Sequence, residues 1–261
     1  MASVHPLDRK DLPEGTRNLF WDVFAGTYSA EQQGDMPEKI IDWLFEIGAV
    51  SEDREILEVG SGPGTYSFGL AERSKTVWCL DSSEKMLDRL FVGAEKTGVK
   101  NLRRMDADWN AFVPKRKWDS VISTLCSGIG SPESLKRMES CSSEYCVIVS
   151  WIRNHGDDLQ SEIWSELGEE YSYRRRSTDG ITEKLRAGGR APFYKDFRSE
   201  VSIELPVNEM VGRQTRTFSV FGLEAEAEKA AEKILSEKFP DGIYRMRAEN
   251  GIRTTVWKPI E

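Results

Sequence analysis

The sequence predicts an α/β protein built on a doubly wound, largely parallel sheet. A short apolar stretch at 56–59 has the composition of a strand and runs into a turn with glycine at positions 60, 62 and 64. Helix-forming residues follow at 65–73, and a second apolar stretch at 76–80 ends in Asp81. Because glycine tolerates positive φ and has no Cβ, a ligand can lie against such a turn. In doubly wound folds, an acid at the end of the second strand takes the ribose hydroxyls of an adenosine-containing ligand.

Length and composition limit the classes of protein to which the chain can belong. At 261 residues the chain can hold one α/β domain with a sizeable core. Its net charge of −8 argues against tight nucleic-acid binding, because neutralising phosphates needs a basic surface. The four cysteines form no C-x-x-C pair and lie far in sequence from the two histidines, so we expect no metal site. No apolar run is long enough to span a bilayer and residues 1–12 are polar, which predicts a cytoplasmic protein without a membrane span.

Hydrophobic periodicity predicts the elements around the turn. Apolar residues at helical spacing predict two helices within 15–47, with a break at 33–37 that places Pro37 in the first turn of the second helix. Further along, the pattern predicts a helix at 83–97, a strand at 118–124, a helix at 133–143 and a strand at 146–152, and the last strand is continuous and apolar as a buried parallel strand should be.

The last part of the chain is predicted to be helical with a final pair of strands. Apolar residues between 159 and 167 predict an amphipathic helix. An alternating strand is predicted at 199–205, and helices at 208–218 and 223–238. The pair Asn250-Gly251 is a turn signal, so we expect a hairpin between strands at 243–247 and 253–258.

The glycine turn also carries a family resemblance. Residues 58–64, Glu-Val-Gly-Ser-Gly-Pro-Gly, resemble motif I of the class I S-adenosylmethionine-dependent methyltransferases. Asp81 and the following Ser-Ser-Glu-Lys-Met-Leu resemble the next motif of that family, and the resemblance covers about residues 15–152. A nicotinamide- or flavin-binding Rossmann protein would instead show G-x-G-x-x-G/A, with a small residue where this chain has Thr65.

The resemblance implies a seven-stranded, mostly parallel sheet with an antiparallel last strand, and S-adenosylmethionine as the cofactor. It implies one folded domain with four segments: an N-terminal helical cap at 1–50, a cofactor-binding core at 51–156, a helical substrate-recognition insertion at 157–200 and the completion of the sheet at 201–261. It implies methyl transfer, for which we expect a small-molecule acceptor and hypothesise an anionic one. The alternatives are methylation of a protein or RNA, and a non-catalytic module that binds the cofactor.

Twelve residues are implied to bind the cofactor, most of them at the turn and at the carboxyl ends of the next strands: Tyr28, Glu58, Gly60, Ser61, Gly62, Gly64, Asp81, Ser82, Met86, Asp108, Trp109 and Thr124. Tyr28, Met86 and Trp109 have core packing as an alternative role. Asp106 is the alternative to Asp108 for the adenine amino group. A further acid, Asp119, stands where the family usually has a structural Asp.

The chemistry needs little beyond alignment. Transfer from a sulfonium is an in-line displacement, and a general base is needed only if the acceptor must lose a proton. His155 follows the fifth strand and is the candidate base, with a surface histidine as the alternative. On the substrate side, Cys126 lies in a glycine- and serine-rich loop, and Arg190 of the insertion could clamp a carboxylate or phosphate. Tyr194 is a weaker candidate of the same kind. The alternative for Cys126 is a small loop residue without a substrate role, and the alternative for Arg190 is a solvated charged face.

Overall fold

The fold is that of a computed structural model, which describes residues 6–8, 12–13, 15–26, 28, 30, 33–153, 158–171 and 179–260. Seven strands within these residues form one sheet in the order β3-β2-β1-β4-β5-β7-β6. Five of them run parallel: β1 (Glu55–Val59), β2 (Thr76–Asp81), β3 (Leu102–Asp106), β4 (Trp118–Thr124) and β5 (Ser142–Arg153). The last strand, β7 (Ile243–Trp257), pairs antiparallel with β5, and β6 (Phe193–Pro206) lies at the edge. The predicted doubly wound sheet with an antiparallel last strand is confirmed.

The chain divides into two compact units, each assembled from several segments. We call residues 33–153, 176–199 and 251–261 the sheet unit, and residues 1–32, 154–175 and 200–250 the helical unit. This division cuts across the predicted segments. The second N-terminal helix belongs to the sheet unit, and the two long helices near the C-terminus belong to the helical unit.

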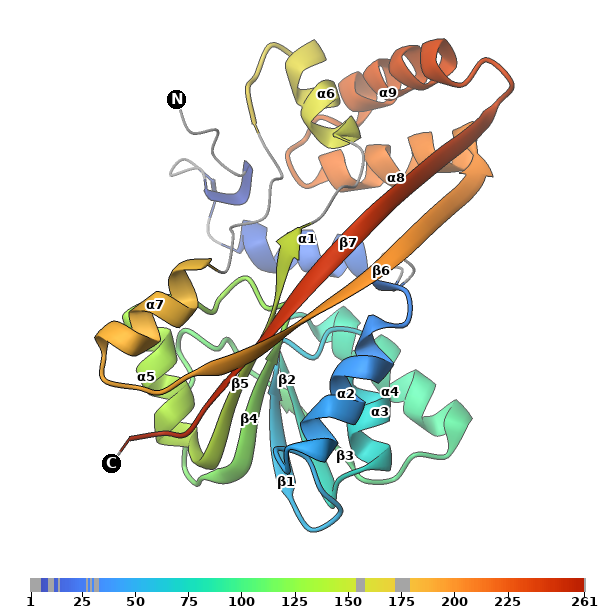
Figure 1. The fold of residues 1–261 in the computed structure, drawn as a ribbon. Helices are drawn as coiled ribbons and strands as arrows, with labels where there is room; N and C mark the ends of the chain where they lie inside the picture. The colour runs from blue at the N-terminus through green and yellow to red at the C-terminus, as the bar shows by residue number, and fades with distance from the viewer. Residues whose placement is uncertain are drawn as a thin grey trace. The chain divides into compact units, whose positions relative to one another are not determined.

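In the sheet unit, helices cover both faces of the parallel strands (Figure 1). One face packs against α2 (Met36–Glu46), α3 (Ser67–Glu72) and α4 (Glu84–Thr97), and the other against α5 (Pro132–Cys141) and α7 (Asp179–Ala187). Alternate residues of β1 show why: Ile56 is buried in the first layer, while Leu57 and Val59 are buried in the second. A parallel strand covered on both faces reads as a continuous apolar run, which is what the sequence shows.

The helical unit has a core of its own. It contains the short helix η1 (Pro6–Asp8), α1 (Thr16–Ala25), α6 (Leu159–Glu166), α8 (Val207–Ser219) and α9 (Glu224–Lys238). Trp164 of α6 is fully buried, with its ring centroid 4.8 Å from that of Phe218 in α8. No helix among the described residues is long and apolar enough to cross a membrane.

The predicted hairpin at Asn250-Gly251 is wrong. Both residues lie inside the continuous strand β7, Asn250 is buried, and Gly251 is paired with Arg153 of β5. A two-residue type I′ turn needs positive φ at both central positions, and neither residue has one. Pairing of Gly251 with β5 inside the continuous strand β7 holds the segment extended, so the tertiary ladder overrides the local turn preference.

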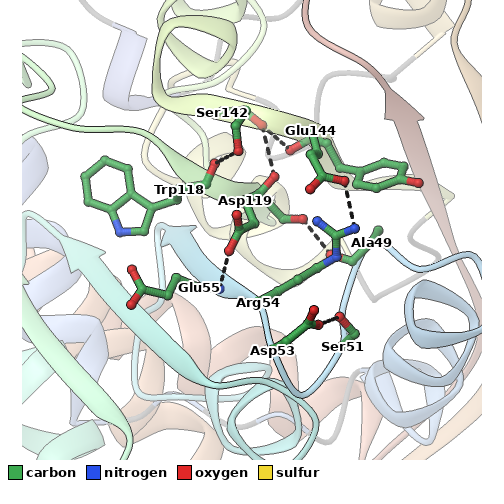
Figure 2. A network of polar contacts seen from close by, with 12 residues as sticks. Ala49, Ser51, Asp53, Arg54, Glu55, Trp118, Asp119, Ser142 and Glu144 are labelled. Carbon is green, nitrogen blue, oxygen red and sulfur yellow. Dashed lines mark hydrogen bonds and ion pairs between the residues drawn. The ribbon is translucent and has the colours of Figure 1, made fainter.

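The edge of the sheet at the amino ends of β1 and β4 is fixed by a polar network (Figure 2). The Asp119 carboxylate accepts a hydrogen bond from the Glu55 backbone N–H at 2.7 Å, and the Ser120 hydroxyl donates to the Ala49 carbonyl at 2.6 Å. Arg54 pairs with Glu144 of β5 at 2.8 Å. Asp119 therefore has the structural role that the family resemblance implied, at the edge opposite the glycine turn.

Candidate functional site

The glycine turn leaves β1 in a conformation that glycine adopts freely. Gly60, Gly62 and Gly64 have φ values of 75°, 53° and 97°, all in the left-handed region. The backbone N–H groups of Gly60 and Ser61 donate to the Leu80 carbonyl at 2.8 and 3.1 Å. The ladder between β1 and β2 thus continues into the turn and fixes its position against the end of β2.

The three glycines meet different surroundings. A Cβ at Gly60 would lie 2.6 Å from the Cβ of Cys126, and one at Gly64 would lie 2.7 Å from the Phe68 ring. A Cβ at Gly62 would have no atom within 4 Å. Gly60 and Gly64 are therefore required by packing within the protein, whereas the backbone at Gly62 borders open space that a ligand can approach.

Asp81 is held against the turn. One carboxylate oxygen accepts from the Gly62 N–H at 2.8 Å, and the other accepts from the Ser83 N–H at 2.9 Å. Ser83 caps α4 by accepting from the Met86 N–H at 3.2 Å. Ser82 between them is exposed. The end of β2, the start of α4 and the glycine turn are joined through a single carboxylate.

Glu58 lies under the turn and is fully buried. Its two carboxylate oxygens accept from the Ser67 hydroxyl of α3 at 2.5 Å and from the Thr124 hydroxyl of β4 at 2.9 Å. Burial raises the pKa of Glu58 to about 7, against the two hydrogen bonds and with a small further rise from Asp81. In this arrangement the side chain contacts hydroxyls of the protein and supports the turn from beneath, and its contact with the cofactor stays a prediction.

The two candidate acids for adenine differ in their surroundings. The Asp106 carboxylate is bound by the Arg104 guanidinium, with N–O distances of 2.8 and 2.9 Å. Asp108, past the end of β3, is exposed and accepts from the Asn110 N–H at 2.8 Å. Because its rival is already paired with an arginine, Asp108 stays our choice.

Two of the implied cofactor residues are packed in the interior. Trp109 is 3% exposed and stacks on Phe112, with centroids 5.9 Å apart and planes at 22°. Met86 is likewise 3% exposed, on the first turn of α4. Both show the core packing that was the alternative for them, and contact with adenine stays a prediction.

The loop after β4 brings backbone strain to the same edge of the sheet. Leu125 has φ of 55° and is the only non-glycine with positive φ among the described residues. Next to it, burial raises the pKa of the Cys126 thiol to about 12, so the thiol is protonated at neutral pH, and its contact with a substrate stays a prediction. The Lys184 ammonium of α7 donates to the Gly130 carbonyl at 2.9 Å and ties the loop to that helix.

Arg190 is corrected from a candidate anion clamp to a structural residue. Its guanidinium holds both carboxylate oxygens of Glu139 at 2.8 and 2.5 Å and donates to the Gly188 carbonyl at 2.6 Å. Trp257 of β7 donates its indole N–H to the same Glu139 at 2.9 Å. This bidentate pair is mostly buried, so its donors are committed to the protein.

Tyr194, the other candidate in this segment, is 44% exposed and lies under the Arg253 guanidinium, 3.9 Å from the ring centroid. Tyr28 belongs to the helical unit, where it packs edge-on against Phe24 with centroids 5.7 Å apart. His155 lies outside the described residues. The cofactor role of Tyr28, the substrate role of Tyr194 and the catalytic role of His155 therefore stay predictions.

Sequence reasoning missed two features of the site. Ser67 supplies one of the two hydroxyls on Glu58, and Leu125 carries the strain of the loop. A serine in the first turn of a short helix has no signal that distinguishes it from a cap. Leu125 gave no signal at all, because leucine is rarely found at positive φ.

Comparison with known proteins agrees with this geometry. Residues 56–143, from β1 to α5, match a family model described as a methyltransferase domain. An uncharacterised protein of Haemophilus influenzae is 33% identical over 101 residues, which are 39% of this chain and 35% of that one. The 23S rRNA (uracil(1939)-C(5))-methyltransferase RlmD of Stenotrophomonas maltophilia is 25% identical over 119 residues, 44% of this chain and 27% of that one. The chain thus spans about a third or less of the curated relatives' length.

Solved structures share the fold. A putative methyltransferase of Bacillus halodurans superposes with a TM-score of 0.54 and 15% identity, over 84% of this chain and 99% of that one. The structure titled as the DhpI-SAM-HEP complex has a TM-score of 0.51 and 17% identity, over 69% of this chain and 90% of that one. At these identities the likeness establishes the arrangement of strands and helices.

The close contact at Gly60 generates a first prediction. Gly60→Ala should lower the free energy of unfolding by about 3 kcal/mol, because it adds positive-φ strain and a clash with the Cβ of Cys126. Gly62→Ala, with the same kind of strain and open space, should cost about 1 kcal/mol. Urea unfolding measures both. Adding Cys126→Gly should recover part of the loss in the Gly60 variant, and a double variant no more stable than the single one would contradict the clash.

Glu58 generates a second prediction, on the pH dependence of stability. The folded carboxyl keeps its proton up to a pKa of about 7 against an ordinary value of 4.5, so the folded state binds the extra proton between these values. The contribution of Glu58 to the free energy of unfolding is therefore largest below pH 4.5. It falls by about 3 kcal/mol as the pH rises through 7. Glu58→Gln removes this loss while keeping hydroxyl partners that can accept as well as donate. In urea unfolding, the free energy of unfolding of the variant should rise relative to that of the wild type between pH 5 and 8. A difference in this free energy that does not change with pH would refute the assignment.

Proposed function

We propose, from the premise that residues 56–143 form a class I, Rossmann-like methyltransferase domain, that the protein binds S-adenosylmethionine and transfers its methyl group to a small-molecule acceptor. The observation that carries the proposal is the hydrogen bond from the Gly62 N–H to the Asp81 carboxylate. It brings together the two sequence features on which the family resemblance depends, at the carboxyl ends of neighbouring parallel strands.

The residues at this edge fit the cofactor. The backbone at Gly62 faces open space, so the turn can receive a ligand without moving. Each Asp81 oxygen accepts a backbone N–H, which holds the carboxylate at the end of β2, where an acid of a doubly wound fold meets the ribose hydroxyls. Asp108 is exposed and can accept from the adenine amino group. When bound, S-adenosylmethionine supplies a methyl group activated on a sulfonium.

The chain's own contribution is to orient the two reactants. The turn at Gly60–Gly64 is fixed from below by Glu58 and from the side by Asp81, so a ligand on it meets a preorganised surface. The loop at 125–131 borders the same edge and is anchored to α7 by Lys184, which supports this loop and α7 as the side of the acceptor. His155 remains our candidate base for an acceptor that must lose a proton.

A small acceptor is supported by the charge of the chain. With a net charge of −8 the protein repels a polyanion such as RNA, which carries many phosphate charges. A small molecule carries few charges or none, so it is repelled much less. The pairing of Arg190 with Glu139 removes the main argument for an anionic acceptor. We therefore propose a small molecule and leave its charge to experiment.

Methylation of RNA is the second candidate. Two relatives favour it by name, the RlmD protein above and a probable ribosomal RNA small subunit methyltransferase A of Methanosphaera stadtmanae, which is 28% identical over 96 residues. Their likeness is confined to 44% and 37% of this chain and to 27% and 35% of those proteins.

Asp81 gives a third prediction, on cofactor affinity. Asp81→Asn should weaken S-adenosylmethionine binding about 10- to 100-fold, because it removes the charge and acceptor lone pairs that ribose hydroxyls need. Asp106→Asn is the matched control, since this acid pairs with Asp81 in the β2–β3 register but is bound to Arg104. Calorimetric titration at one pH measures both. Equal affinities of wild type and Asp81→Asn would contradict the proposed ribose contact.

A fourth prediction separates the two acceptor classes. With a labelled methyl donor, the protein should transfer label to the small-molecule fraction of a cell extract and leave purified ribosomal RNA unlabelled. Adding salt tests the result, because binding to a polyanion weakens steeply with ionic strength and binding to a small neutral molecule does not. Transfer to RNA alone would favour the second candidate, and no transfer to either would favour a non-catalytic cofactor-binding module.

A further inference from the structure

Glu58 is a buried acid without a cation partner. No lysine or arginine among the described residues pairs with it, and its only hydrogen-bond partners there are the hydroxyls of Ser67 and Thr124. The other well-buried glutamate, Glu139, is treated differently by the fold, because Arg190 neutralises it through two hydrogen bonds. A buried charge without a partner is costly, and the usual outcome is that the group takes up a proton.

Of the two titratable groups beside Glu58, one makes its charge still less favourable and the other is neutral. Asp81 raises the pKa of Glu58, and Cys79 is a neutral thiol whose own pKa burial raises. Both belong to β2, while α3 and β4 contribute the uncharged hydroxyls of Ser67 and Thr124. Two carboxyls at one turn, with no basic side chain paired to Glu58, leave the site short of positive charge.

Thr124 links this acid to the turn itself. Its hydroxyl lies 2.9 Å from a Glu58 oxygen and 3.3 Å from the Gly60 carbonyl oxygen, and it has one proton to donate. If Glu58 is ionised, Thr124 donates to the carboxylate. If Glu58 is neutral, its O–H can donate to Thr124, whose hydroxyl then turns to the Gly60 carbonyl. The charge of Glu58 thereby decides which hydrogen bond the first residue of the turn receives.

We propose that Glu58 is a proton-linked positioning residue, neutral in the free protein and ionised when a cationic ligand lies on the glycine turn. The inference rests on the proposed function, which supplies that ligand: a nucleoside carrying a sulfonium and an ammonium group. On binding, the O–H bond of the Glu58 carboxyl breaks, the electron pair stays on the carboxylate and the proton passes to solvent. Thr124 then donates to the carboxylate and releases the Gly60 carbonyl.

Such a linkage favours the sulfonium form of the ligand. Ionising the buried acid is repaid by attraction to positive charge, so a ligand without the sulfonium charge gains less from it. S-adenosylhomocysteine, the demethylated product, keeps the ammonium and lacks the sulfonium. The site would accordingly hold the donor more tightly than the spent product and expel the product with uptake of a proton.

Proton release on binding tests the inference directly. Calorimetric titration with S-adenosylmethionine at pH 6.5, in two buffers that differ in ionisation enthalpy, counts the protons released. About 0.7 of a proton should be released, since most of the Glu58 carboxyl is protonated at this pH. At pH 6.5 the ligand's own amine stays charged, because α-amino groups titrate near pH 8. The affinity should also rise about 10-fold or more from pH 5.5 to 7.5.

Two variants and one ligand serve as controls. Glu58→Gln should bind with release of about zero protons and with an affinity that no longer depends on pH in this range. Glu139→Gln removes a buried acid that Arg190 keeps ionised, so it should release as many protons as the wild type. S-adenosylhomocysteine should release fewer protons than S-adenosylmethionine from the wild type.

The outcomes separate this inference from the proposed function. Tight binding of S-adenosylmethionine without proton release, or equal release from wild type and Glu58→Gln, overturns the role of Glu58 and leaves the methyltransferase proposal standing. Absence of binding by folded protein overturns both. Release confined to wild type and Glu139→Gln supports the inference.

Discussion

The hydrogen bond between the Gly62 N–H and the Asp81 carboxylate is the constraint on which the site depends. Both groups come from the carboxyl ends of adjacent parallel strands, and the register of β1 against β2 brings them to the same edge. Because the other Asp81 oxygen holds the Ser83 N–H, the carboxylate also fixes the start of α4. Loss of this one side chain would loosen the turn, the helix and the edge of the sheet together.

Glu58 shows the opposite use of a carboxyl group. Asp81 lies partly exposed and accepts backbone N–H groups, whereas Glu58 is sealed beneath the turn with two hydroxyls. A hydroxyl can donate or accept, so this environment suits either protonation state, and an arginine would have suited only one. Replacing Glu58 with an apolar residue would remove the cost of burial and with it the connection between α3, β4 and the turn.

Much of the first part of the chain could be predicted because its signals are local. The turn, the acid that ends β2 and the helices at 16–25, 36–46 and 84–97 each carry their signal within a few residues, and the structure has them where the pattern put them. The errors arise where distant segments decide. Asn250-Gly251 has the sequence of a turn, but pairing with β5 keeps it extended. Arg190 resembles a surface cation, and only the fold brings it to Glu139, about fifty residues away in sequence.

The correction at Arg190 changes the account of specificity. Its pair with Glu139, together with the indole N–H of Trp257, joins the segment after α7 to α5 and to the last strand. That segment is therefore built into the sheet unit, and Lys184 fastens α7 to the loop beside the turn. Arginines in an insertion suggest recognition of an anion, but the Arg190 guanidinium is paired with Glu139 within the protein. We therefore expect discrimination among acceptors to depend on the strained loop at Leu125 and on the neutral side chains around it, such as the Cys126 thiol.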